Sequence, residues 1–320
     1  MKRIIYTGIA VLILFFVLVG CQEEKLGSTI FDTSSEKLDP TSASYKLDKY
    51  LYDNFTEKYN LQFRYKMQDV GADMEYNLVP ASYENSKKMA ALVKYLWFDV
   101  YAKVVGPDFL KAYGPRIIHL IGSAAFNPAN GTILLGLAEG GLKVSLFRVN
   151  AIDPNNVDML NEYYFKTMHH EFSHILHQTK TYPKEFNLIS FKDYETFNWQ
   201  DRDQKVAASL GFVSPYGGSQ TREDFVEVIA NYIVKTDAQW DLILDEASKG
   251  WVVNTSGVLV QGTDADGVDG KATILRKLSI CRTWLRDSWS VDLDALRAEV
   301  QLRQQSINLD SLLLDIDNIK

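Results

Sequence analysis

The chain has 320 residues, a formal net charge of −7, 46% hydrophobic and 23% charged residues, and two cysteines. These values are typical of a globular protein and exclude a disordered protein, a collagen or coiled-coil rod, a disulfide-rich mini-domain and a multi-pass membrane protein. Because phosphate binding needs clustered positive charge, the acidic balance also argues against a nucleic acid as the main partner.

The N-terminus has the three parts of a secretory signal, since a basic start precedes an apolar run that ends in the lipobox-like Leu18-Val19-Gly20-Cys21. The run is too short and too close to the N-terminus to be preferred as a membrane span. We predict a lipoprotein signal over 1–21, an acylated Cys21 that anchors the mature chain to a membrane, and a flexible tether over 22–44. The acidic residues after Cys21 resemble signals that send lipoproteins of Gram-negative bacteria to the exterior face of the outer membrane. A solvated charge run explains them equally well.

We expect residues 45–320 to form one α+β domain, with a helix-and-sheet half over 45–158 and a mainly helical half over 159–320. Apolar residues at helical spacing predict helices, and alternating apolar residues between Gly-rich turns predict the strands of a small mixed sheet. In chain order, the expected elements are helix 45–55, strand 61–67, helix 83–105, strands 115–126, 131–138 and 141–149, and helices 161–178, 202–210, 221–248, 271–289 and 291–306.

Two other features of the second half carry less weight. Residues 250–270 are rich in Gly and Asp and are expected to form a strand pair or a long loop. Within them, Asp264-Ala265-Asp266-Gly267 hints at a calcium loop, but the terminal glutamate of such a loop is missing, so we predict no calcium site. Cys281 has no cysteine left to pair with if Cys21 is acylated, and we expect it to be a small buried residue.

Four of the five histidines lie within nine residues, on the predicted helix 161–178. His170-Glu171-Phe172-Ser173-His174 forms an H-E-x-x-H motif, and positions i and i+4 lie about 40° apart around a helix. Both imidazoles therefore project from one face and can bind a single Zn²⁺, while Glu171 can take a proton from water at the metal. The motif predicts a zinc site with His170 and His174 as ligands.

The two neighbouring histidines are not expected to be ligands. His177 lies on the same face but about 10 Å along the helix axis from His170, so we expect it to support a ligand or to pack. His169 lies off that face and is likewise expected to support a ligand or to pack. The longer H-E-x-x-H-x-x-G-x-x-H pattern is ruled out, because Lys180 occupies the position of its third histidine.

A catalytic zinc site needs a third protein ligand. The segment 222–230 offers carboxylates at helical spacing among apolar residues. Glu223 and Glu227 stand at i and i+4, so a second helix could present Glu223 to the metal and Glu227 to a ligand histidine. Asp224 is the alternative third ligand. A further alternative is that Glu223 and Glu227 are solvated surface residues with no role at a metal.

Three blocks carry a family resemblance, namely HHEFSHILHQTKTYPKEF, GFVSPYG and EDFVEVIANYI. In this order they resemble the zinc-binding metallopeptidase lipoproteins of Bacteroides-type bacteria, a zincin group often encoded near glycan- and nutrient-uptake genes. The resemblance covers most of residues 150–310 and implies a zincin-like peptidase fold. Tyr216-Gly217, seven residues before Glu223, also resembles the lethal-factor type of zincin. That likeness implies that Tyr216 assists the transition state and that Glu223 binds zinc.

The function expected is therefore that of a membrane-anchored zinc metalloendopeptidase acting on a peptide or protein. His170, His174 and Glu223 would hold Zn²⁺, Glu171 would be general base and then proton donor, and Tyr216 would stabilise the oxyanion. The substrate would lie along strand 131–138 or 141–149 by β-addition. The rivals are a catalytically weak or inactive zincin-scaffold lipoprotein that binds peptides or glycans, and a metal-scavenging lipoprotein. Neither of these needs a base at Glu171.

Overall fold

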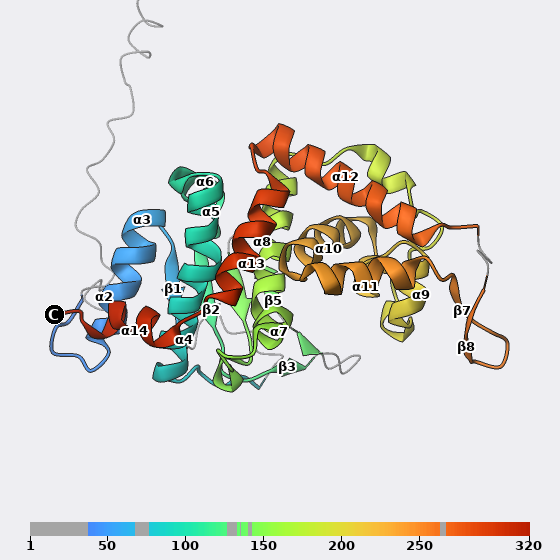
Figure 1. The fold of residues 1–320 in the computed structure, drawn as a ribbon. Coiled ribbons are helices and arrows are strands. Elements are labelled where there is room, and N and C mark those ends of the chain that lie inside the picture. Colours follow the sequence, from blue (N-terminus) through green and yellow to red (C-terminus); the bar gives the residue numbers. More distant parts are fainter. Residues whose placement is uncertain (1–37, 68–76, 127–132, 135, 140–142, 263–266) are drawn as a thin grey trace, which may run out of the picture. The chain divides into compact units, whose positions relative to one another are not determined.

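A computed structural model describes residues 38–67, 77–126, 133–134, 136–139, 143–262 and 267–320. The predicted signal, Cys21, most of the tether and Asp264 to Asp266 lie outside the described residues. All the helices and strands described below belong to one compact unit, Ser42–Lys320 (Figure 1). Among the described residues, none of the helices combines the length and the apolar character that a membrane crossing requires.

The first half contains the predicted helices 45–55 and 83–105, each interrupted by one π-helical turn. Its helices are α2 (Tyr45–Leu51), α3 (Glu57–Tyr59), α4 (Tyr83–Val93), α5 (Asp99–Val104) and α6 (Pro107–Tyr113). The helical stretch that starts at Tyr83 is capped by the Ser82 side chain, which accepts from the Asn85 N–H. It ends before Gly106, which has φ 115°, and Pro107 then starts α6.

The first half also contains a small mixed sheet, in agreement with the predicted α+β class. Its strands are β1 (Gln62–Arg64), β2 (Ile117–Leu120), β5 (Gly136–Glu139) and β6 (Lys143–Leu146), in the order β1-β2-β6-β5. β2 pairs in parallel with β1 and β6, whereas β5 is antiparallel to β6 and forms one edge. A separate antiparallel pair joins β3 (Ala125–Phe126) to β4 (Ile133–Leu134).

The second half is mainly helical, as expected. Its helices are α7 (Val157–Leu160), α8 (Lys166–Thr179), α9 (Gln204–Ser209), α10 (Thr221–Val234), α11 (Asp237–Ala247), α12 (Gly270–Trp289), α13 (Leu293–Gln305) and α14 (Leu309–Asp317). One hairpin, β7 (Trp251–Val253) with β8 (Leu259–Gln261), accounts for the predicted strand pair.

In this half one expectation was wrong and one helix was missed. The predicted helix 221–248 is two helices, because Thr236 leaves the helical conformation and forms a capping box with Gln239, which starts α11. Helix α14 was not predicted. It follows the N-cap residue Asn308, whose side chain accepts from the Ser311 N–H, and it packs on α2 and α4 of the first half.

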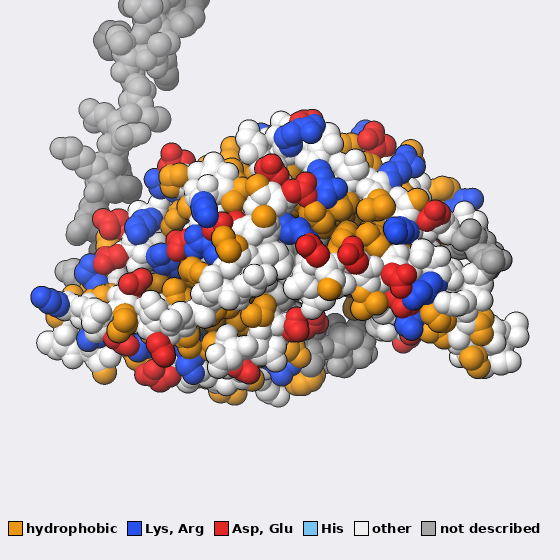
Figure 2. Space-filling model, in the orientation of Figure 1, with side chains coloured by type: hydrophobic (Ala, Val, Ile, Leu, Met, Phe, Trp, Pro, Cys, Tyr) orange, Lys and Arg blue, Asp and Glu red, His pale blue; other side chains and the backbone are white. Residues whose placement is uncertain are grey.

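One hydrophobic core runs through both halves, and α8 and α10 cross it side by side. In α10 every residue from Glu223 to Val234 is buried, carboxylates included. On the face that Figure 2 shows, acidic and basic side chains are interspersed. Because ionisable side chains are rarely buried, the unusual feature of the interior is the set of such groups at the contact between α8 and α10.

Candidate metal centre

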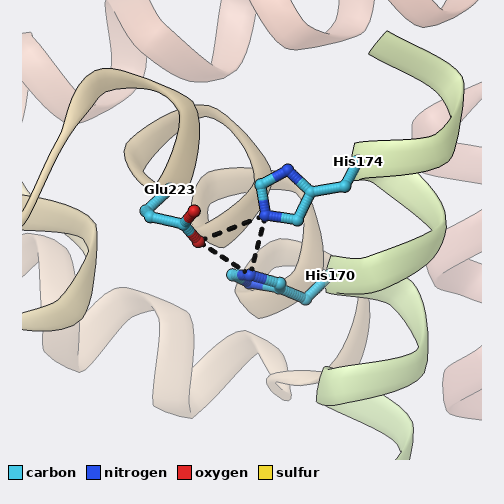
Figure 3. Close-up of side chains that lie close together, drawn as sticks. All are labelled: His170, His174 and Glu223. Carbon is cyan, nitrogen blue, oxygen red and sulfur yellow. Dashed lines mark hydrogen bonds and ion pairs between the residues drawn. The ribbon is translucent and has the colours of Figure 1, made fainter. Parts of the chain in front are cut away.

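His170 and His174 of α8 meet Glu223 of α10 in one group (Figure 3). Glu223 Oε2 lies 3.0 Å from His170 Nε2 and 3.2 Å from His174 Nε2, and the two Nε2 atoms are 3.2 Å apart. One ligand atom from each residue falls within 4.8 Å of the others. Two imidazole nitrogens and a carboxylate oxygen are donors that Zn²⁺ accepts, and three protein ligands are the number found in catalytic zinc sites. The group therefore fits a catalytic zinc ion.

Each histidine of the group has a second partner on its other ring nitrogen. His170 Nδ1 lies 2.9 Å from Glu227 Oε1, one turn along α10 from Glu223. His174 Nδ1 lies 2.8 Å from His177 Nε2. Such contacts orient the rings of metal-binding histidines and hold their Nε2 atoms toward the ion. Glu227 and His177 thus occupy the supporting positions that the helical spacing suggested.

Glu227 is itself held by two residues that the sequence did not single out. Ser214 donates to Glu227 Oε2, and the Asn231 amide donates to the same atom at 3.1 Å. Asn231 is one turn after Glu227 on α10, so it could have been found from the i, i+4 spacing. Ser214 lies in the loop before α10, and no signal in the sequence indicates its contact.

The charges at the centre are strongly coupled. Burial lowers the pKa of His170, but the hydrogen bonds that its ring donates to the carboxylates of Glu223 and Glu227 outweigh this effect and raise that pKa to about 10. Burial would raise the pKa of each glutamate, yet other contacts hold both pKa values well below their usual range. At Glu223 these are the hydrogen bonds with His170 and His174. At Glu227 they are the charge of Lys166 and then the hydrogen bond with His170. A concentration of negative charge that retains a proton on histidine also favours a divalent cation at the same atoms.

Glu171 and Tyr216 flank the group. Burial raises the pKa of the Glu171 carboxyl, and the nearby His170 and His174 partly offset this effect. The Tyr216 ring stacks on the His170 ring with centroids 5.8 Å apart, and 37% of the residue is exposed. Burial and the Glu223 carboxylate raise the pKa of the Tyr216 hydroxyl, so it stays a hydrogen-bond donor.

The alternative ligand, Asp224, is not a member of the group. Its Oδ2 pairs with Lys277 Nζ at 2.6 Å and accepts from the Tyr194 hydroxyl at 2.7 Å. His169 points into the core, where its Nδ1 lies 3.1 Å from the Tyr101 hydroxyl, and burial lowers the pKa of His169 to about 3. Cys281 is buried, as expected.

Comparisons with known proteins agree with this chemistry. A family model described as "Putative zinc-binding metallo-peptidase" matches residues 40–294. A crystal structure of a protein with that description, from Bacteroides caccae, is 40% identical, with a TM-score of 0.68, and the match covers 88% of this chain and 99% of that one. Among curated proteins, the comparison finds none that matches.

Proposed function

Because the chain belongs to this family of zinc-binding metallopeptidases, we propose that it is a membrane-anchored zinc endopeptidase with a zincin-type fold. The observation that carries the proposal is the convergence of His170, His174 and Glu223 beside Glu171. A site that only stored metal would need the three donors but no carboxylate acting as a base. The substrate class is a peptide or protein.

Each residue of the site would have its own role in peptide hydrolysis. His170, His174 and Glu223 would hold the ion, which when bound supplies Lewis acidity and makes water a nucleophile at neutral pH. Glu171 accepts a proton from the attacking water and returns it to the leaving amine. The Tyr216 hydroxyl donates to the former carbonyl oxygen, where negative charge builds in the transition state. Glu227 and His177 keep the two imidazoles in place.

The substrate would bind as an extended strand. β5 is an edge strand of the mixed sheet, antiparallel to β6, and it contacts α8. An edge strand offers unpaired backbone N–H and C=O groups, which a peptide can pair with by β-addition. The support for this binding mode is the position of the Gly136–Glu139 backbone at the edge of the sheet.

The anchor is the acylated Cys21, followed by the tether to the folded unit. Its support is the lipobox and the apolar run before it. An enzyme held at the outer membrane would act on peptides at that surface. If the acidic residues after Cys21 act as the export signal that they resemble, the enzyme would face the exterior.

The test combines a zinc count with a peptide-library digest, on the wild type and on Glu171→Gln. The variant keeps the size of the side chain and removes the base, so we expect about one zinc per chain in both proteins and hydrolysis in the wild type alone. A His170→Ala control should lose zinc and activity together.

Two outcomes would overturn the proposal. Full activity in Glu171→Gln would show that the carboxylate is not the base. A zinc-loaded wild type that cleaves no peptide in the library would instead favour a binding lipoprotein that kept the scaffold.

A further inference from the structure

The segment 191–202, between α8 and α9, forms a rim beside the metal centre and exposes large apolar side chains. Phe197 is 85% exposed and Phe191 is 61% exposed. The rim is nevertheless fixed in place, because the Glu195 N–H donates to the Gly218 carbonyl at 2.8 Å and the Tyr194 hydroxyl donates to Asp224. These contacts attach it to the loop that carries Tyr216 and to the first turn of α10.

A row of rings connects this rim with the metal centre. The half-buried Trp199 packs edge-on against Tyr216, with centroids 4.9 Å apart and planes at 67°. Tyr216 in turn stacks on the ligand His170. Trp199 is therefore separated from a metal ligand by one ring, and Phe197 lies two residues away in the same ordered segment.

Apolar groups in this position indicate a ligand. Burying a Phe side chain is favourable, so leaving Phe197 in water forgoes most of that stabilisation. Binding sites are lined mainly by apolar and aromatic side chains with a few convergent polar groups. Here the polar groups are those of the metal centre, and the aromatic groups are Trp199 and Phe197.

We propose that Trp199 and Phe197 form a substrate subsite that takes an aromatic or large aliphatic side chain next to the scissile bond. This inference rests on the proposed peptidase function. Trp199 would be the inner wall, because it touches Tyr216, which faces the developing oxyanion. Phe197 would be the outer wall, covered when the peptide binds. The protein would thus prefer peptides with Phe, Tyr, Leu or Met at that position.

The test compares two peptides that differ only at this position, Phe in one and Ser in the other, after a library digest has located the cleaved bond. We expect Trp199→Leu to reduce the ratio of their kcat/KM values about 10-fold or more, in line with the selectivity of apolar pockets. The matched control is Trp251→Leu. Trp251 is also half-buried, but it contacts Lys205 and Glu246 of α9 and α11, and the ratio should not change.

A second measurement separates this subsite from the peptidase function. In the Glu171→Gln background, which is expected to turn over no substrate, binding of fluorescein-labelled peptides is followed by fluorescence polarisation. The Phe peptide should bind more tightly than the Ser peptide, and Trp199→Leu or Phe197→Ala should reduce that difference. If the wild type cleaved no peptide, a Phe-containing peptide that binds and its Ser variant would replace the pair, and the same result would still support the subsite.

Two results would overturn the subsite. If Trp199→Leu lowered kcat equally for both peptides and left their binding unchanged, Trp199 would only hold Tyr216 in position. If the rim bound a neutral β-1,4-glucan hexasaccharide but showed no preference between the two peptides, the aromatic surface would serve sugars instead.

Discussion

Lys277 of α12 and Asp224 of α10 form an ion pair with Nζ and Oδ2 2.6 Å apart, and both side chains are 0% exposed. Lys277 also donates to the Gly211 carbonyl at 2.8 Å, while Asp224 accepts from Tyr194. The pair thus joins α12, the loop before α10 and the rim to the helical turn that carries Glu223. Replacing Lys277 by Met should destabilise the fold and weaken zinc binding together.

The loss of stability can be judged from the contacts that Asp224 keeps after the substitution. After Lys277→Met, Asp224 is buried with only the Tyr194 hydroxyl, since its Oδ1 has no hydrogen-bond partner among the described residues. Breaking one side of a buried ion pair costs about 3–5 kcal/mol. At roughly 2–4 °C per kcal/mol for a large domain, the melting temperature should fall by about 6–20 °C. A total stability of about 5–15 kcal/mol leaves little margin for such a loss.

The assay is thermal unfolding followed by near-UV circular dichroism, with zinc affinity measured below the transition. The double variant Lys277→Met with Asp224→Asn has no buried charge and should recover more than half of the loss. Lys111→Met is the control, because Lys111 and Asp108 form a surface pair, 50% and 86% exposed, and it should cost less than about 1 kcal/mol. A Lys277→Met protein that melts within 2 °C of wild type, or a double variant no better than the single, would refute the reasoning.

Three further predictions concern the centre and the anchor. Glu223→Ala should abolish zinc binding at concentrations that saturate the wild type, whereas Glu227→Ala should weaken zinc affinity or activity about 10- to 100-fold; isothermal titration ranks the two, and a larger effect from Asp224→Ala than from either would move the ligand. Tyr216→Phe should lower kcat about 10²- to 10³-fold with little change in zinc content or KM, and near-normal turnover would reduce Tyr216 to a packing residue. Cys21→Ser should accumulate unprocessed or soluble protein, and unchanged membrane fractionation together with no acyl label on the wild type would exclude the anchor.

The spacing of residues along one helix was enough to predict the part of the site that lies on that helix. His170 and His174 had to share a face because any α-helix places i and i+4 together, whatever surrounds it. The same rule related Glu223 to Glu227. The helix 83–105 was predictable for similar reasons, since Gly106-Pro107 stops it locally. The break between α10 and α11 has a local signal as well, in the spacing of Thr236 and Gln239. The apolar pattern on both sides hid that signal.

The choice between Glu223 and Asp224 could not be made in this way, because it depends on how α10 is rotated about its axis. Neighbours on a helix point about 100° apart, so only one of the two can face α8. Lys277, more than fifty residues later, takes Asp224 as its partner, and this ion pair stabilises the observed rotation. Had α10 turned the other way, Lys277 would have been buried without a carboxylate, and such a cation costs several kcal/mol. The ion pair in the core therefore stabilises the rotation that brings Glu223 to the metal centre. Loss of the pair should displace Glu223 and weaken zinc binding.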